Sequence, residues 1–200
     1  MKPPQEFPRV RSATRSGGWE VEGVGYRTQA QLCLSRFEQK GALLRKKMDR
    51  LETARRKGSV YRIPPMLMEE YRFYGSAAVV YSAMAVEGFL NYYGVKRLGE
   101  SFYREHFERL SPHRKLAALV ATCIGHLLPD DTELIATIRR IAERRNALVH
   151  PKTREPKPRH SRQNITTLPP NPAADSVRDM ERFFELFIQL DPEAVGAILW

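Results

Sequence analysis

The chain has 200 residues, 42% of them hydrophobic, and its 33 lysines and arginines against 23 acidic residues give a net charge of +10. This length and apolar fraction fit one domain with a single core, and the positive charge favours a polyanionic partner such as nucleic acid. Only two cysteines are present, Cys33 and Cys123, which argues against a disulfide framework or a zinc site and indicates small buried thiols in a reducing cytosol.

Residues 1–27 are rich in proline, glycine, arginine and serine and show no helical period. We expect this segment to be an extended arm, with a short strand where "WEVEGVGY" (19–26) alternates between apolar and polar residues. The first residues lack the apolar run of a secretory signal.

The remainder, 28–200, is predicted to be one all-α domain, a helical bundle of four to five helices with the extended arm in front of it. Its regions of helical period are about 28–57, 65–93, 99–109, 111–128 and 131–150, with a C-terminal helical unit over 174–200. Gly58 and Gly94 are expected to end the first two helices. Residues 151–173 hold six prolines and are basic at first, as is typical of a loop.

The longest apolar stretch, "GSAAVVYSAMAVEGFLNYYG" (75–94), carries Glu87 in its middle. A carboxylate at this point favours a buried core helix over a membrane span. We therefore expect a cytoplasmic protein without a membrane partner.

The helix expected over 131–150 ends in "ERRNALVH", directly before Pro151. Its inward face would contain positions 134, 138, 141, 145 and 148, which places Arg145 on the core side, where a charge needs a partner or a cleft. Pro151 disfavours helical geometry at His150, so this histidine can turn back toward Arg145, with Asn146 beside them.

These residue types suit phosphodiester chemistry. Histidine moves protons near neutral pH, and arginine binds phosphate and stabilises developing negative charge. No carboxylate pair or metal cluster is evident in the sequence, so neither a metal nor another cofactor is expected. The alternative is purely structural: arginine and histidine at a helix C-terminus interact favourably with the helix dipole, and proline is an ordinary stop signal.

The segment Arg145-Asn146-Ala-Leu-Val-His150 resembles the R-x4-6-H signature of the HEPN superfamily. "YSAMAVEGFLNYYG" (81–94) is similar to the long helix of that family with its acidic residue, and "SPHRKLAAL" (111–119) is similar to the lysine-bearing helix before the motif. The resemblance covers roughly residues 65–152.

This resemblance implies an α-helical bundle that forms a homodimer, with Arg145 and His150 facing their symmetry mates across a cleft. Active members are metal-independent endoribonucleases, often toxins or antiviral-defence effectors, sometimes paired with an antitoxin or another defence-system protein. They use the RNA 2′-OH as nucleophile and leave a cyclic phosphate. By analogy His150 handles the proton, Arg145 holds the scissile phosphate and Asn146 positions one of them.

Glu87 lies on one stripe of its helix with Val80, Met84 and Asn91, and a carboxylate in this setting needs a cation. We predict that Glu87 contacts Arg144, Arg145 or His150 and supports the site, so Arg144 is a supporting residue as well. The alternative is that Glu87 pairs with an arginine or lysine elsewhere on the surface.

Five basic residues are candidates for RNA phosphate contacts: Arg45, Lys46, Lys47, Lys152 and Arg154. Runs of charge on a long helix are also typical of a plain solvated face. The apolar residues of the C-terminal unit are expected in the core, although Trp200 could instead cover a dimer or antitoxin interface. Two other functions remain open: a non-catalytic HEPN-fold adaptor or binding module, and a plain helical RNA-binding protein.

Overall fold

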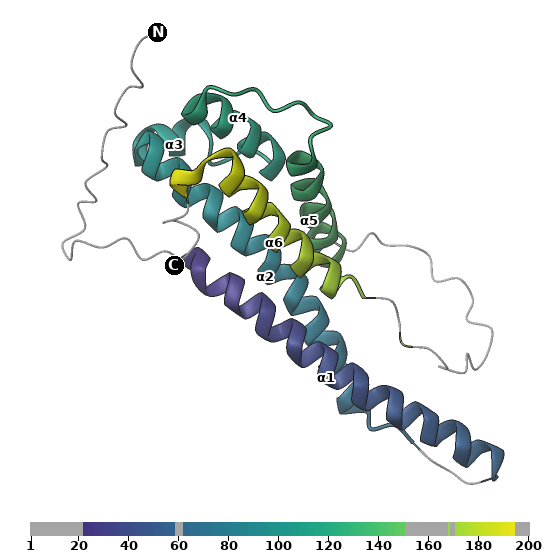
Figure 1. The fold of residues 1–200 in the computed structure, drawn as a ribbon. Helices are drawn as coiled ribbons and strands as arrows, with labels where there is room; N and C mark the ends of the chain where they lie inside the picture. The colour runs from purple at the N-terminus through teal and green to yellow at the C-terminus, as the bar shows by residue number, and fades with distance from the viewer. Residues whose placement is uncertain (1–21, 59–61, 151–167, 169–170, 195–200) are drawn as a thin grey trace.

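The computed structural model describes residues 22–58, 62–150, 168 and 171–194. Within these ranges the chain is all-α, as predicted, without a strand. Its elements are α1 (Glu22–Arg56), α2 (Pro65–Leu98), α3 (Glu100–His106), α4 (Pro112–Ile124), α5 (Glu133–Val149), α6 (Ala173–Leu190) and the 3-10 helix η1 (Pro192–Ala194) (Figure 1). The described residues form six α-helices, one more than the upper end of the expected four to five, and the short helix expected over about 99–109 is present as α3.

The first helix begins earlier than predicted. Residues 22–27 belong to α1, so the expected arm over 1–27 and strand over 19–26 are wrong for this part, while residues 1–21 lie outside the described residues. Tertiary contacts explain the difference: the ring of Tyr26 stacks on that of Tyr81 with centroids 6.0 Å apart, and Arg27 pairs with Glu181 on α6. The local alternation of side chains carries no information about these contacts.

The second helix continues beyond Gly94, where the sequence predicted its end, and stops at Gly99, which has φ of 84°. Gly94 is buried, and a Cβ atom there would lie 2.4 Å from the ring of Tyr103. This glycine therefore permits the close approach of α3 to α2 and does not act as a helix stop.

The core lies between α2 and α6. Phe89 packs edge-to-face against Phe183, Phe184 and Phe187, with ring centroids 4.9–6.1 Å apart, so the predicted core role of these C-terminal phenylalanines is confirmed. Leu199 and Trp200 lie outside the described residues. α2 is long and apolar enough by length and composition to cross a membrane, but it is the helix on which the others pack, and half of its most apolar window is buried.

The cysteine thiols are free, as expected. Cys123 is buried and Cys33 is half-buried. Burial raises the pKa of the Cys123 thiol to about 11, so this residue behaves as a small apolar side chain at neutral pH.

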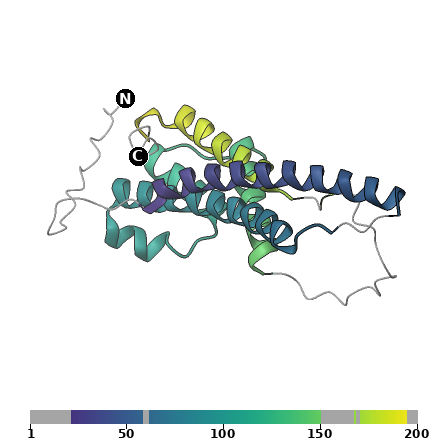
Figure 2. The ribbon, with the colours of Figure 1, turned by 90° about the horizontal axis from the view of Figure 1, so that it is seen from below.

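The helices α1 and α2 form a long antiparallel hairpin that extends well past the other helices (Figures 1 and 2). The ring of Phe37 stacks on that of Tyr71 at 4.4 Å, and Lys40 donates to Glu70 at 2.7 Å. Because these contacts lie in the projecting part, they hold α1 against α2 where no other described helix supports it.

Candidate functional site

The motif helix α5 starts where the sequence predicts. The hydroxyl of Thr132 accepts a hydrogen bond from the backbone N–H of Ile135 at 3.4 Å, which caps the helix. Leu134, Ile138 and Ile141 are buried on the expected inward face. Leu148 was expected on the same face but is 38% exposed, because no described helix covers the last turn of α5.

Arg145 and Glu87 lie together, as predicted. Nη2 of Arg145 is 3.7 Å from Oε2 of Glu87, and both side chains are partly exposed. This distance makes an ion pair but exceeds hydrogen-bond length, so the guanidinium keeps its N–H donors for another group. The carboxylate of Glu87 thus holds Arg145 near the surface without accepting a hydrogen bond from its guanidinium.

His150 is the C-terminal cap of α5. Its φ and ψ of −122° and 66° leave the helix, as expected before Pro151, and its backbone N–H donates to the carbonyl of Asn146 at 2.9 Å. The side chains of both residues are exposed, and within the described residues no hydrogen bond joins either of them to Arg145. The imidazole is therefore accessible to solvent, five residues after Arg145.

Arg144, a predicted supporting residue, pairs with α6 and not with Glu87. Its Nη1 lies 2.5 Å from Oδ2 of Asp179 on α6, and Arg140 binds the same carboxylate at 2.9 Å. Arg144 and Arg145 are successive residues, so the turn of the helix points them to different neighbours. Arg144 therefore links α5 to α6, and its predicted role as a supporting residue stays a prediction.

A buried polar cluster beneath Glu87 was missed in the sequence. Lys115 on α4 is only 1% exposed, and its ammonium donates to Oδ1 of Asn91 at 2.7 Å. The hydroxyl of Tyr103 donates to the same oxygen at 2.5 Å. Asn91 lies one turn after Glu87 on α2, and Glu87 pairs with Arg145 on α5, so residues of four helices contribute to this polar region.

The charges within this cluster depend on one another. Burial lowers the pKa of Lys115, and the negative charges of Glu87 and Glu108 offset part of that effect. Burial and the same two carboxylates raise the pKa of Tyr103, which keeps its proton as a donor. A signal was available: Lys115 lies four residues before Leu119, on the apolar face of its helix.

Of the residues predicted to bind RNA, the three that the structure describes lie on a different helix from the motif. Arg45, Lys46 and Lys47 are on the projecting part of α1, the first two exposed and the third half-buried. Lys152 and Arg154 fall outside the described residues.

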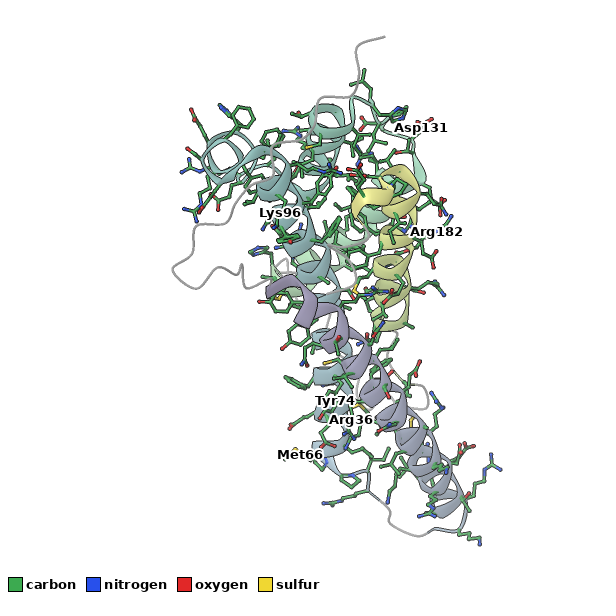
Figure 3. The ribbon with its side chains drawn as sticks, turned by 60° about the vertical axis from the view of Figure 1, so that its left-hand side comes forward. Arg36, Met66, Tyr74, Lys96, Asp131 and Arg182 are labelled. Carbon is green, nitrogen blue, oxygen red and sulfur yellow. The ribbon has the colours of Figure 1, made fainter. Side chains whose placement is uncertain are left out.

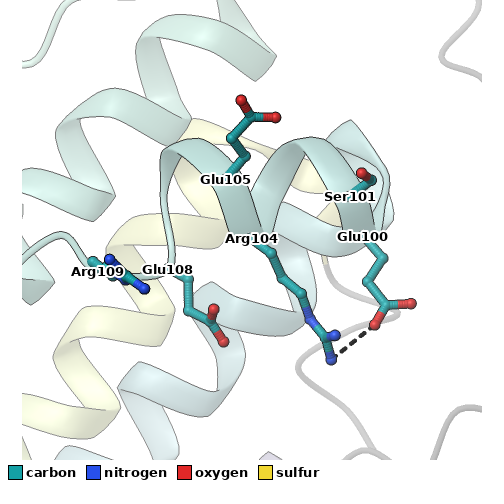
Figure 4. A pocket seen from close by; sticks show the side chains of 6 residues that line it. All are labelled: Glu100, Ser101, Arg104, Glu105, Glu108 and Arg109. Carbon is teal, nitrogen blue, oxygen red and sulfur yellow. Dashed lines mark ion pairs between the residues drawn. The ribbon is translucent and has the colours of Figure 1, made fainter.

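A surface hollow lies at α3, and its lining is strongly charged (Figure 4). Glu100, Ser101, Arg104, Glu105, Glu108 and Arg109 line it. Arg104 pairs with Glu100 at 2.8 Å. Burial lowers the pKa of Lys115 in the polar cluster, and the negative charge of Glu108 offsets part of this effect. Among the residues that the structure describes, no group of three or more histidine, cysteine, aspartate or glutamate side chains is placed to hold a metal ion.

No family model, no curated protein and no solved structure matches the chain. The resemblance to the HEPN superfamily therefore depends on the motif residues and their context in the sequence.

Proposed function

We propose that the protein is a metal-independent endoribonuclease of HEPN type. The observation that supports this most is the pairing of Arg145 with Glu87 at a distance that leaves the guanidinium donors free, five residues before an exposed His150. Arg144, by contrast, directs Nη1 to Oδ2 of Asp179 at 2.5 Å, within hydrogen-bond distance.

The chemistry follows from these groups. His150 accepts the proton of the ribose 2′-OH, the 2′-oxygen bonds to the adjacent phosphorus, and the bond from phosphorus to the 5′-oxygen breaks. The leaving 5′-oxygen takes a proton, so the products are a 2′,3′-cyclic phosphate and a 5′-hydroxyl. Arg145 stabilises the negative charge on the phosphoryl oxygens, and Asn146 orients the phosphate or the imidazole.

A second copy of the chain would complete the site. One histidine accepts a proton while another donates one, and two copies of His150 supply both groups. Leu148 and Val149 are 38% and 49% exposed beside the motif, which supports an apolar contact between copies at this end of α5. A homodimer is therefore part of the proposal.

The cellular role proposed with this activity is that of a cytoplasmic toxin or antiviral-defence nuclease, held in check by an antitoxin or another defence-system protein. A free ribonuclease damages the cell that makes it, so its activity needs control. The free end of α5 offers one surface for such a partner.

The reaction predicts a strict requirement for the 2′-hydroxyl at the cleaved nucleotide. Purified protein should cleave an RNA oligonucleotide in excess EDTA, and the same oligonucleotide with a single 2′-deoxy nucleotide at the mapped cleavage site should resist cleavage there. Mass spectrometry of the RNA products should show a cyclic phosphate, because no water enters the first step.

Other outcomes favour other functions. Cleavage of the deoxy-substituted oligonucleotide at an unchanged rate would show that a different nucleophile acts. RNA binding without cleavage of either oligonucleotide by folded protein would favour the adaptor or RNA-binding alternatives.

A further inference from the structure

The outward face of α1 is a basic surface, here called the α1 stripe. Its positions recur every three or four residues and are exposed throughout: Leu32, Arg36, Gln39, Leu43, Lys46, Arg50, Thr53 and Lys57. Four of these eight residues are basic and none is acidic. The acids of this part of α1, Glu38, Asp49 and Glu52, occupy other positions of the helix.

The cations of the α1 stripe are available to a ligand. Within the described residues no ion pair engages Lys46, Arg50 or Lys57, whereas the neighbouring Arg56 pairs with Glu52 at 2.5 Å. Arg36 makes only a 3.5 Å contact with Gln39 of the same stripe. Solvated cations in one row form a footprint for a polyanion.

The α1 stripe lies on the hairpin, at a distance from Arg145. Tyr71, which stacks on Phe37, lies sixteen residues before Glu87 on α2, or about 24 Å at 1.5 Å per residue. From Arg36 to Lys57 the stripe then extends a further 32 Å or so on the same rise. Figure 3 shows the side chains of this projecting hairpin, with Arg36 labelled on α1 and Met66 and Tyr74 on α2.

We propose that the α1 stripe binds the phosphate backbone of structured RNA and thereby selects substrates long enough to reach from the hairpin to Arg145. This inference rests on the proposed ribonuclease function for its choice of RNA. Proteins that hold single strands combine basic residues with aromatic side chains on which bases stack, and the stripe has no aromatic residue. Its contacts would therefore be to phosphates alone, as on a duplex.

A membrane surface fits these residues less well. A helix that lies in a lipid interface needs a continuous apolar face. On the α1 stripe the apolar side chains are Leu32 and Leu43, eleven residues apart, while Phe37, Leu44 and Met48 of the same helix are buried.

The test measures binding by the full chain carrying His150→Ala, so that the RNA remains intact. The probe is a fluorescent RNA stem-loop of about 20 base pairs, longer than the roughly 16-base-pair footprint of a double-stranded-RNA-binding domain. Adding Lys46→Gln, Arg50→Gln and Lys57→Gln should weaken binding tenfold or more. The slope of log affinity against log salt should fall by about 2 to 3, because each lost phosphate contact contributes about 0.9.

A matched control removes the same charge elsewhere. The control variant alters three exposed arginines outside the hairpin: Arg104→Gln, Arg109→Gln and Arg114→Gln. Its affinity for the stem-loop should stay within about threefold of that of the parent carrying His150→Ala alone. A single strand of about 6 nucleotides, short within the range of single-strand sites, should bind weakly and equally to both triple variants.

Equal losses of stem-loop binding in the two triple variants would overturn the proposal, since net charge alone would then explain binding. It would also fail if phosphatidylserine vesicles, and not the stem-loop, bound in a manner that depends on the stripe. Failure of the proposed ribonuclease function would be a separate result. If the wild-type chain cleaved no RNA, the affinities of the two triple variants could still be compared.

Discussion

Replacing Arg145 with alanine is expected to slow RNA cleavage by about 10²–10³-fold, the effect of removing one preorganised donor from a developing negative charge. Arg145 and Glu87 are both partly exposed, so this replacement should change the free energy of unfolding by less than about 1 kcal/mol. Single-turnover rates, together with thermal unfolding of the same samples, separate lost chemistry from lost folding.

Two further variants make the Arg145 experiment specific. Arg139 lies on the same helix as Arg145 and pairs with Asp130 at 2.8 Å. Arg139→Ala should leave the rate of RNA cleavage unchanged. Glu87→Gln keeps the size of the side chain but removes the charge that holds Arg145, so it should slow cleavage less than Arg145→Ala does. Wild-type cleavage rates in Arg145→Ala would remove this arginine from the mechanism.

Replacing Asp179 with asparagine is expected to lower the free energy of unfolding by about 2–3 kcal/mol at neutral pH. The carboxylate is nearly buried and binds both Arg140 and Arg144, so its loss leaves two cations without their partner. This loss in the free energy of unfolding is smaller than for a fully buried ion pair because Arg140 is 44% exposed. Urea denaturation followed by circular dichroism measures the change.

The effect of Asp179→Asn should also depend on pH. Burial by itself would raise the pKa of Asp179, but hydrogen bonds from Arg140 and Arg144 outweigh it and hold the pKa below its ordinary value. A carboxyl group whose pKa is lower in the folded state contributes stability above its unfolded pKa, and this contribution is lost as the pH falls through the folded pKa. The difference between wild type and variant should therefore shrink in acid below about pH 4.

A control for Asp179 lies on the same helix. Asp175 is half-exposed and pairs with Arg178 one turn away, so Asp175→Asn should change stability by less than about 0.5 kcal/mol at any pH. Equal losses from the two substitutions, or a difference that persists in acid, would contradict the assigned role of Asp179.

Local signals in the sequence were sufficient for several features. Thr132 caps α5 because a hydroxyl at this position satisfies a free backbone N–H, and His150 leaves the helix because proline follows it. A pairing of Glu87 with a cation of the motif was also predictable, since a carboxylate on an apolar helix needs a cation, but the sequence left Arg144, Arg145 and His150 open as the partner.

Features that depend on packing between helices were not predictable from local patterns. Gly94 looked like a helix stop, but its lack of a side chain serves the approach of Tyr103 from a different helix. Arg144 and Arg145 are adjacent and chemically identical, and only the packing of α6 against α5 assigns Asp179 to one of them. The burial of Lys115 likewise depends on where α2 and α3 place Asn91 and Tyr103.

We propose that residues of this chain cleave RNA without a metal ion. The most direct test of this proposal is single-turnover cleavage of one RNA in excess EDTA by wild type and His150→Ala, purified in parallel and shown to be folded. We expect cleavage by wild type and a rate at least about 10²-fold lower in the variant, as for the loss of a general base. Equal cleavage by both proteins, or no cleavage by folded wild type, would contradict the claim.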